Sequence, residues 1–354
     1  MENTSQESNN FLNWVEIKNF KSINDLRFDC KRVNVFIGKP NVGKSNILEG
    51  LGLLGAGYSV GKILNGFVRY RDIKQLYRDN DKRAKIEVVT DKQQIQINAL
   101  PSLFAIGAQG TTSINKENYS IGGRDGISRI ISASGAPSRE ISVGNEDHEE
   151  RFQRYFRAVK KYDYGNLVDF TDSLETYLSP PNGSNLYSLV RSDNVLWAEF
   201  AKLFTEQQLE LVLYDEKQEF ILQKKNGPFV TQYPYFSIAD TFRRFMFYIT
   251  AIESNRNSIL VFEEPEVHSF PPYVKAMAHR IVGSESNQFF VSTHSPYLLQ
   301  TLISELDESE LAVFITFYKD YQTQVRQLTV DELQEAQDLS IDLFYNLSRY
   351  EPNA

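Results

Sequence analysis

Residues 38 to 46, GKPNVGKSN, have the residue types and spacing of a phosphate-binding loop. Gly38 and Gly43 are followed by Lys44 and Ser45, which matches the pattern G-x-x-x-x-G-K-[ST]. Glycines let the backbone wrap a phosphate chain, so that successive N–H groups point at its oxygens. We expect Lys44 to reach the β- and γ-phosphates and Ser45 to ligate Mg²⁺. The candidate nucleotide-binding residues are Gly38, Lys39, Pro40, Asn41, Val42, Gly43, Lys44, Ser45 and Asn46.

A pair of glutamates follows an aliphatic run in SILVFEEPE, residues 258 to 266. At the end of a strand beside a phosphate-binding loop, Glu263 would help to hold Mg²⁺ and Glu264 would orient or deprotonate the attacking water. Adjacent residues on a strand point to opposite sides, so both carboxylates reach the γ-phosphate only if a turn begins here. Pro265 favours that turn. The preceding strand favours this interpretation over an ordinary exposed acidic turn.

Two histidines follow. His294 comes directly after the apolar run in NQFFVSTHSPYLL, where it could hydrogen-bond the γ-phosphate or the attacking water. A lone histidine is usually structural, but the order of the three motifs favours a function. His268, in EVHSFPP, has two possible interpretations: it contacts a partner subunit, or it caps a turn.

The elements that must position these residues are predicted from periodicity. Alternation and apolar runs predict strands over 14–20, 23–29 and 32–38, a helix over 44–59 and a β-hairpin over 84–100. Nearer the C-terminus, strands and helices alternate, which predicts a mainly parallel sheet with helices packed on it. The expected elements there are a helix over 236–255, strand 258–262, a helix near 272–283, strand 287–293, a helix from about Pro296, strand 311–317 and strand 321–328.

The middle of the sequence is less regular. Residues 106 to 147 are rich in Gly, Ser and Asn, which predicts a loop-rich segment. Residues 149 to 206 are expected to be helical with a break at LSPPNGSN, and residues 209 to 227 to form a hairpin. No heptad pattern persists for three repeats, which disfavours a long coiled-coil arm.

Composition sets the broad class. The chain has 354 residues, 41% apolar and 24% charged, as in a soluble globular protein. No stretch is apolar and long enough to span a bilayer, and the single cysteine, Cys30, leaves no intrachain disulfide, so we expect a cytoplasmic protein. A net charge of −8 does not favour bulk nucleic-acid binding. The basic stretch over 68–85 is either a solvated face or a local surface for nucleic acid or an acidic partner.

The three motifs together resemble those of the ABC-type ATPases of the SMC, RecF and OLD group, often called AAA-family ATPases. GKPNVGKSN is similar to the Walker A motif, ILVFEEPEVHSFPP to Walker B and the D-loop, and VSTHSPYLL to the switch-histidine loop. The resemblance implies an α/β P-loop NTPase fold, an ABC-type ATPase head with a mainly parallel central sheet, an N-terminal antiparallel β subdomain and an α/β insertion. The expected parts are an N-terminal ATPase lobe over 1–100, a loop-rich and helical insertion over 101–230 in place of a coiled-coil arm, and a C-terminal ATPase lobe over 231–354.

The same resemblance implies ATP and Mg²⁺ as cofactors. It makes Glu264, His294 and Lys44 the catalytic residues, with Ser45 and Glu263 at the metal, although relatives usually carry aspartate where this chain has Glu263. Glu266 and His268 fall where the family's subunit contacts run. Gln75 is a weak candidate for the Q-loop glutamine.

One motif departs further from the family. FSIADTFRRF, residues 236 to 245, stands where relatives carry a Ser-Gly-Gly signature that grips the γ-phosphate of the other subunit. Ser237 could supply the hydroxyl and is included among the nucleotide-binding candidates. Asp240 replaces a glycine and is unfavourable near a triphosphate unless Arg243 or Arg244 offsets its charge.

The resemblance implies an ATPase that dimerises through an ATP sandwich and drives or gates a DNA-processing or anti-phage defence partner. No Toprim nuclease is apparent, so we expect a separate effector, a nuclease or a toxin. DNA is a possible partner, and binding to a membrane is not expected. The divergent signature motivates an alternative, a low-turnover nucleotide-gated switch or scaffold in a defence or toxin assembly. A transporter subunit is disfavoured by the same signature and by the IKNFKSI opening.

Overall fold

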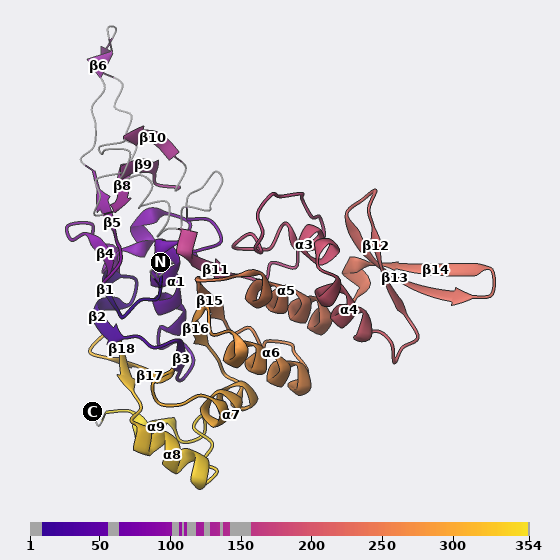
Figure 1. The fold of residues 1–354 in the computed structure, drawn as a ribbon. Coiled ribbons are helices and arrows are strands. Elements are labelled where there is room, and N and C mark those ends of the chain that lie inside the picture. Colours follow the sequence, from indigo (N-terminus) through magenta and orange to yellow (C-terminus); the bar gives the residue numbers. More distant parts are fainter. Residues whose placement is uncertain are drawn as a thin grey trace, which may run out of the picture.

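The computed structural model describes residues 9–55, 64–100, 106–107, 110–111, 118–123, 128–134, 137–141 and 157–352 (Figure 1). Two large sheets and the helices between and beside them form an α/β architecture, as predicted. The order of layers is an antiparallel sheet, helix α1, the central sheet, and a layer of helices on its other face.

The central sheet runs in the order β11-β15-β16-β3-β17-β18. The first five strands are parallel to their neighbours, and β18 pairs antiparallel with β17. Side chains alternate between its faces: Val35 packs toward α5, α6 and α7, whereas Phe36 packs toward α1. Its strands are β11 (Val159–Tyr162), β15 (Ile259–Glu263), β16 (Gln288–Ser292), β3 (Val33–Ile37), β17 (Leu311–Lys319) and β18 (Gln322–Gln327).

The helices around this sheet follow the predicted alternation. Buried aliphatic residues of α1 fill the space between the two sheets, so the helix that begins at the phosphate-binding loop is fixed from both sides. The helices are α1 (Lys44–Leu54), α5 (Asp240–Ser254), α6 (Pro271–Gly283), α7 (Pro296–Glu305), α8 (Val330–Asp338) and α9 (Leu347–Tyr350). Among the described residues, no helix is both long and apolar enough to cross a membrane.

The N-terminal sheet is antiparallel and larger than expected. It runs in the order β10-β9-β8-β5-β4-β1-β2, so the described parts of 106–147 add three strands to it. The prediction of a loop-rich segment there was incomplete, because Tyr119, Ile121 and Ile131 alternate with Gly and Ser and still bury one face. Its strands are β1 (Trp14–Phe20), β2 (Ile23–Asp29), β4 (Ile86–Thr90), β5 (Gln94–Ala99), β8 (Asn118–Gly123), β9 (Ser128–Ser132) and β10 (Pro137–Ile141).

The helical prediction for 149–206 is confirmed only in its second half. Helices α3 (Leu186–Ser192) and α4 (Asn194–Lys202) follow the predicted break, whereas residues 159–162 form β11, an edge strand of the central sheet. Residues 149–156 lie outside the described part. The sequence VKKY hid this strand because its two lysines are buried by partners from distant segments.

Lys160 is one of these buried lysines. Its Nζ donates to Asn255 Oδ1 (2.5 Å) and Ser258 Oγ (3.0 Å) and lies 3.7 Å from the centre of the Tyr177 ring. Burial lowers the pKa of Lys160 from its ordinary value of 10.5 to about 7, and the charge of Glu175 opposes the shift only in part.

We expect the Lys160→Met variant to lose a pH dependence that the wild-type protein shows. Between pH 7 and 10.5 the unfolded chain holds a proton that the folded chain releases, so the wild-type free energy of unfolding rises with pH in this window. Between pH 7 and 9.5 the gain relative to Lys160→Met should be about 2–3 kcal/mol. Urea unfolding at several pH values measures it, with the exposed Lys202→Met as control. Parallel curves for wild type and Lys160→Met would contradict the assignment.

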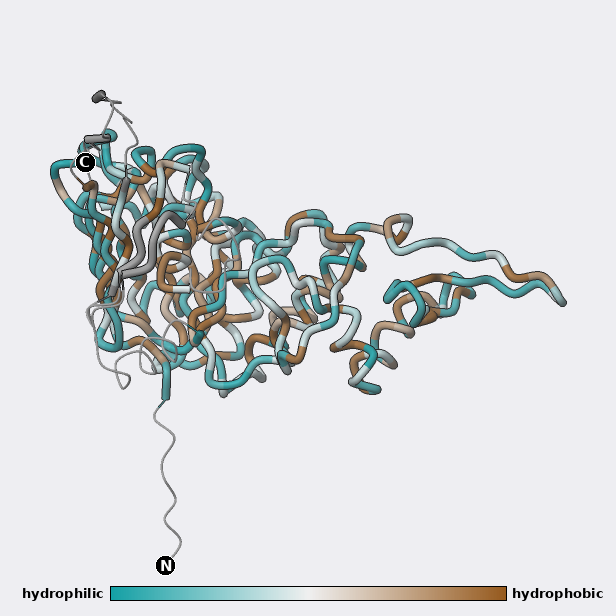
Figure 2. Tube along the Cα trace, turned by 90° about the horizontal axis from the view of Figure 1, so that it is seen from above, coloured by the Kyte–Doolittle hydropathy of each residue, from teal (hydrophilic) through white to brown (hydrophobic). Residues whose placement is uncertain are grey.

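A small third sheet projects from the rest of the structure. Strands β12 (Glu210–Tyr214), β13 (Glu219–Asn226) and β14 (Phe229–Pro234) form it, and the predicted hairpin corresponds to its first two strands. The β13–β14 hairpin reaches away from the central sheet in both views (Figures 1 and 2). Its last strand leads directly into the signature-like segment. The remaining short elements are β6 (Ile106–Gly107), β7 (Gly110–Thr111) and the 3₁₀ turns Ile73–Leu76, Arg78–Asn80 and Tyr235–Ser237.

Candidate active site

The three motifs meet at one edge of the central sheet. Strand β16 lies between β3 and β15, all three are parallel, and so their carboxyl ends share this edge. The loop 38–43 follows β3, Glu263 ends β15, and Ser292 at the end of β16 pairs with both Glu263 and Phe36. In open parallel sheets this edge is where ligands bind.

The phosphate-binding loop passes very close to neighbouring atoms at its two glycines. A Cβ at Gly38 would lie 2.2 Å from the carbonyl oxygen of Thr316 in β17. Gly43 has φ +98°, and a Cβ there would lie 1.9 Å from Thr323 Oγ1. Asn41 adopts a left-handed conformation with φ 60°, at the exposed crest of the loop beside Lys39 and Pro40. This shape requires glycine at both ends of the loop. The loop leads into the N-terminus of α1, where backbone N–H groups can bind phosphate.

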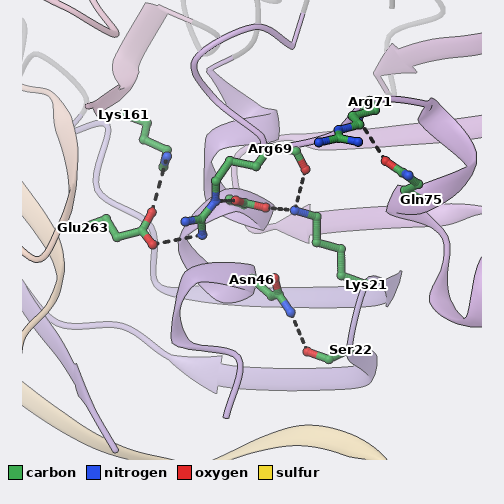
Figure 3. Close-up of polar contacts among 9 residues, drawn as sticks. Lys21, Ser22, Asn46, Arg69, Arg71, Gln75, Lys161 and Glu263 are labelled. Carbon is green, nitrogen blue, oxygen red and sulfur yellow. Dashed lines mark hydrogen bonds and ion pairs between the residues drawn. The ribbon is translucent and has the colours of Figure 1, made fainter. Parts of the chain in front are cut away.

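Polar side chains from both ends of the chain brace the loop. Thr323 Oγ1 donates to the carbonyl oxygen of Val42 (2.9 Å) and lies 2.6 Å from Ser22 Oγ. Asn46 Nδ2 donates to the same Ser22 oxygen (2.6 Å), so its amide group joins this bracing network (Figure 3). Lys39 Nζ pairs with Glu351.

Lys44 begins α1 and folds back over the loop. Its Nζ donates to the carbonyl oxygens of Gly38 and Lys39, each at 2.9 Å, and the side chain is buried. Burial lowers the pKa of Lys44, and the charges of Glu264 and Glu263 oppose that shift. The ammonium group therefore lies within electrostatic reach of both carboxylates. Ser45 follows at the half-buried start of the helix.

The turn predicted between the two glutamates is present. Glu264 has φ +45°, an uncommon conformation for a residue with a side chain, and Pro265 follows it. The N–H of Glu264 donates to the carbonyl oxygen of Ser292 (3.0 Å), which ties the turn to the end of β16. The reversal places the Glu264 carboxylate beside the histidine loop.

His294 faces Glu264 across this edge. Its Nε2 lies 3.4 Å from Glu264 Oε1, and both side chains are partly exposed. Burial and the positive charge of Lys44 lower the pKa of His294 below its ordinary 6.5, while the charge of Glu264 opposes the shift. The imidazole is therefore neutral at pH 7 and can donate or accept a hydrogen bond. Glu264, His294 and Lys44 lie at the same edge of the sheet and influence one another electrostatically, which the sequence could propose only from motif order.

Glu263 has partners that the sequence did not reveal. Arg69 NH2 lies 3.0 Å from its Oε1, and Lys161 Nζ lies 3.8 Å from its Oε2 (Figure 3). Arg69 also pairs with the fully buried Glu49 through Nε (2.6 Å), and Lys21 pairs with the other oxygen of Glu49. Arg69 belongs to the basic stretch over 68–85, which was identified from the sequence as a possible binding surface. Lys161 lies in a segment that was expected to be helical, so nothing in the sequence indicated its contact with Glu263.

The metal prediction can be tested against this donor set. Ser45 and Glu263 offer a hydroxyl and a carboxylate, the oxygen ligands that Mg²⁺ prefers together with phosphate oxygens and water. The described residues contain no cluster of three or more His, Cys, Asp or Glu suited to a metal. The set fits Mg²⁺.

The signature-like segment offers an exposed hydroxyl and a neutralised carboxylate. Ser237 is exposed and donates to the carbonyl oxygen of Pro234 (2.6 Å); among the described contacts none joins it to the loop 38–46. Asp240 starts α5 and pairs with Arg244 (2.7 Å) and Arg243 (3.6 Å), so both arginines offset its charge. The Thr241 hydroxyl donates to the carbonyl oxygen of His268 (2.5 Å), which links α5 to the turn after Glu264.

Two sequence expectations need correction. Gln75 caps a 3₁₀ turn, where its Oε1 accepts the N–H groups of Arg71 (2.9 Å; Figure 3) and Asp72 (3.3 Å). Local capping thus accounts for this glutamine. Glu266 is buried inside the protomer instead of standing at a subunit surface, because its carboxylate contacts the histidine loop.

The fold and the motif order define a P-loop ATPase domain of the SMC/RecF-like kind. A family model described as "AAA domain, putative AbiEii toxin, Type IV TA system" matches residues 33–300, and the chain belongs to this family. No curated protein matches the sequence at a significant level.

Solved structures agree on the fold. The chain is similar to an SmcHead bound to the C-winged helix domain of ScpA, with 16% identity, a TM-score of 0.50, and 92% of this chain and 99% of that chain covered. It is also similar to an Smc head domain with an extended coiled coil, bound to the C-terminal domain of ScpA and derived from Pyrococcus furiosus, with 12% identity, a TM-score of 0.50 and 94% and 100% covered. The recognised family and the predicted fold class are therefore confirmed.

Proposed function

We propose that this protein binds and hydrolyses Mg-ATP. The observation that carries the proposal is the convergence of Lys44, Glu264 and His294 at the edge where β3, β15 and β16 end. A phosphate cradle alone fits any P-loop protein, whereas a carboxylate 3.4 Å from a neutral imidazole beside that cradle fits activation of a water.

Each residue has a separate task in this proposal. Lys44 leaves the carbonyl groups of the loop and contacts the β- and γ-phosphates. Glu264 orients the attacking water and accepts its proton, and His294 hydrogen-bonds that water or the γ-phosphate. Ser45 and Glu263 would hold Mg²⁺, which when bound polarises the phosphate oxygens.

The same proposal includes a head-to-tail homodimer. Ser237 ends the exposed 3₁₀ turn that precedes α5 and makes no described contact with the phosphate-binding loop of its own chain. An exposed hydroxyl can donate to a phosphate oxygen, so we place Ser237 against the nucleotide of a second subunit. The Asp240 charge is compatible with this placement because Arg244 and Arg243 neutralise it.

We further propose that ATP-dependent closure gates a separate effector in DNA processing or anti-phage defence. The family description names a toxin–antitoxin system, which supports a role in defence. The two similar Smc heads were solved with ScpA domains, which supports a separate partner protein. We propose a nuclease or a toxin as that effector. Whether DNA is also a partner is to be tested by a DNA-binding measurement.

The paired state of Glu263 favours a second candidate, a nucleotide-gated switch with little turnover. Arg69 and Lys161 already neutralise the carboxylate expected at the metal, which would disfavour metal binding until the nucleotide competes for these cations. ATP turnover measured with and without DNA separates the candidates. A rate near zero in every condition, with ATP bound, supports the switch.

Mixing two inactive variants tests the hydrolysing dimer. We expect Lys44→Ala and Ser237→Arg each to lose most ATPase activity, and an equal mixture to regain roughly a quarter of the wild-type rate. The reason is statistical: half the dimers are mixed, and each mixed dimer has one intact site of two. Lys44→Ala mixed with Gly43→Ala is the matched control and should stay inactive, because both changes lie in the same half-site.

Phosphate release is the measurement, and light scattering verifies that mixed dimers form. Mixed dimers without recovered activity would contradict a site completed in trans. A wild-type protein that binds Mg-ATP and releases no phosphate would contradict hydrolysis.

A further inference from the structure

Glu266 is a buried carboxylate that the proposed chemistry does not use. Its side chain is only 9% exposed, and one oxygen, Oε1, accepts both the Thr293 hydroxyl (2.7 Å) and the N–H of His294 (2.8 Å). Among the described residues, its other oxygen, Oε2, is buried without a hydrogen-bond partner. Leaving a buried carboxylate oxygen unpaired is costly, so packing alone gives no reason for glutamate here.

The geometry points to a role for Glu266 in positioning His294. Glu264 and Glu266 flank Pro265 on one short turn, and each contacts the histidine at a different place. Glu264 faces the imidazole at 3.4 Å, whereas Glu266 holds the backbone N–H. We infer that Glu266 fixes the distance between the Glu264 carboxylate and the His294 ring, an inference that rests on the proposed function of that pair.

The hydrogen bonds that begin at Glu266 continue to the start of α7. The Thr293 hydroxyl that donates to Glu266 also accepts the N–H of Ser295 (2.9 Å), and Ser295 caps the first turn of α7. One carboxylate oxygen thus organises the three residues between β16 and α7. These side-chain contacts hold the loop between β16 and α7 in addition to its backbone contacts.

The same turn is connected to the signature-like helix. His268, two residues after Glu266, receives the Thr241 hydroxyl of α5 through its carbonyl oxygen. Movement of α5 when a second subunit docks at Ser237 would therefore reach His294 through the turn and Glu266. This route makes Glu266 a positioning residue that couples the dimer half-site to the histidine loop.

Turnover kinetics give the first test. We expect Glu266→Ala to lower the kcat of ATP hydrolysis about tenfold or more and to change KM by less than about twofold, since the loop 38–46 is untouched. Glu266→Gln keeps an acceptor oxygen at the same distance and should retain most of kcat. In the His294→Ala background, adding Glu266→Ala should cost nothing further, because the two act as one unit. Glu285→Ala, an exposed carboxylate, is the control.

Hydrogen–deuterium exchange gives a second test that needs no activity. The His294 amide should exchange about tenfold faster in Glu266→Ala than in wild type, and close to the wild-type rate in Glu266→Gln. If the wild type lacks turnover, the proposed function fails and this exchange rate still decides the inference. Wild-type exchange in Glu266→Ala, wild-type kcat in Glu266→Ala, or an equal loss in Glu266→Gln would each overturn it.

Discussion

Replacing Glu264 by glutamine is expected to slow ATP hydrolysis by about 10²- to 10³-fold and to leave ATP binding intact. Glutamine has the same length and keeps the turn before Pro265, and its amide oxygen can still accept from His294. It cannot accept the proton of the attacking water. Because the nucleotide is then bound without being consumed, the closed dimer should accumulate.

Two measurements check this expectation. Phosphate release gives the rate, and light scattering with Mg-ATP should show a mass twice that of the monomer for Glu264→Gln. The exposed Glu285→Gln should behave as the wild type in both measurements. Wild-type turnover in Glu264→Gln would remove Glu264 as the base, whereas a lasting monomer would argue against the sandwich dimer.

Gly43→Ala should abolish nucleotide binding, with an affinity loss of at least about 100-fold. The residue has φ +98°, which strains any side chain, and its new Cβ would lie 1.9 Å from Thr323 Oγ1 and 2.9 Å from Ser22 Oγ. Relief of these clashes must move either the loop or the β17–β18 hairpin that braces it. We expect the free energy of unfolding to fall by about 1–3 kcal/mol as well.

Calorimetric titration with Mg-ATP measures the affinity, and thermal unfolding measures the stability. Gly283→Ala is the matched control, because that glycine ends α6 and a Cβ there has no atom within 4 Å. The control should bind ATP normally and keep its stability. Normal ATP binding by Gly43→Ala would show that the loop adopts another shape when it holds phosphate.

The parts of the fold that could be predicted are those with a local signal. Strands β3, β15 and β16 are short, mostly apolar runs, and a helix follows each of them after a short loop. Helix α8 had a signal that was overlooked: Thr329 and Glu332 form a capping box at its start.

Other parts depend on contacts that no local pattern contains. Strand β11 holds two buried lysines because Asn255, Ser258 and Glu263 receive them, and these residues lie about a hundred positions away. Arg69 was visible as part of a basic stretch, but its pairing with Glu263 was not. Glu266 was expected where subunit contacts run, since no residue near it in the sequence shows that Thr293 would accompany it in the interior. The division into 1–100, 101–230 and 231–354 stays a prediction.

The bracing of the phosphate-binding loop by β17 and β18 has a consequence for protein synthesis. The loop is encoded in the first fifty residues, yet Thr316 and Thr323, which shape Gly38 and hold Val42, are translated almost three hundred residues later. A growing chain would carry the full motif without its bracing partners until β17 and β18 have been made. Competence to capture nucleotide would therefore arise only after these strands, so that products truncated before them would carry the motif without acting as ATP-loaded partners of intact subunits.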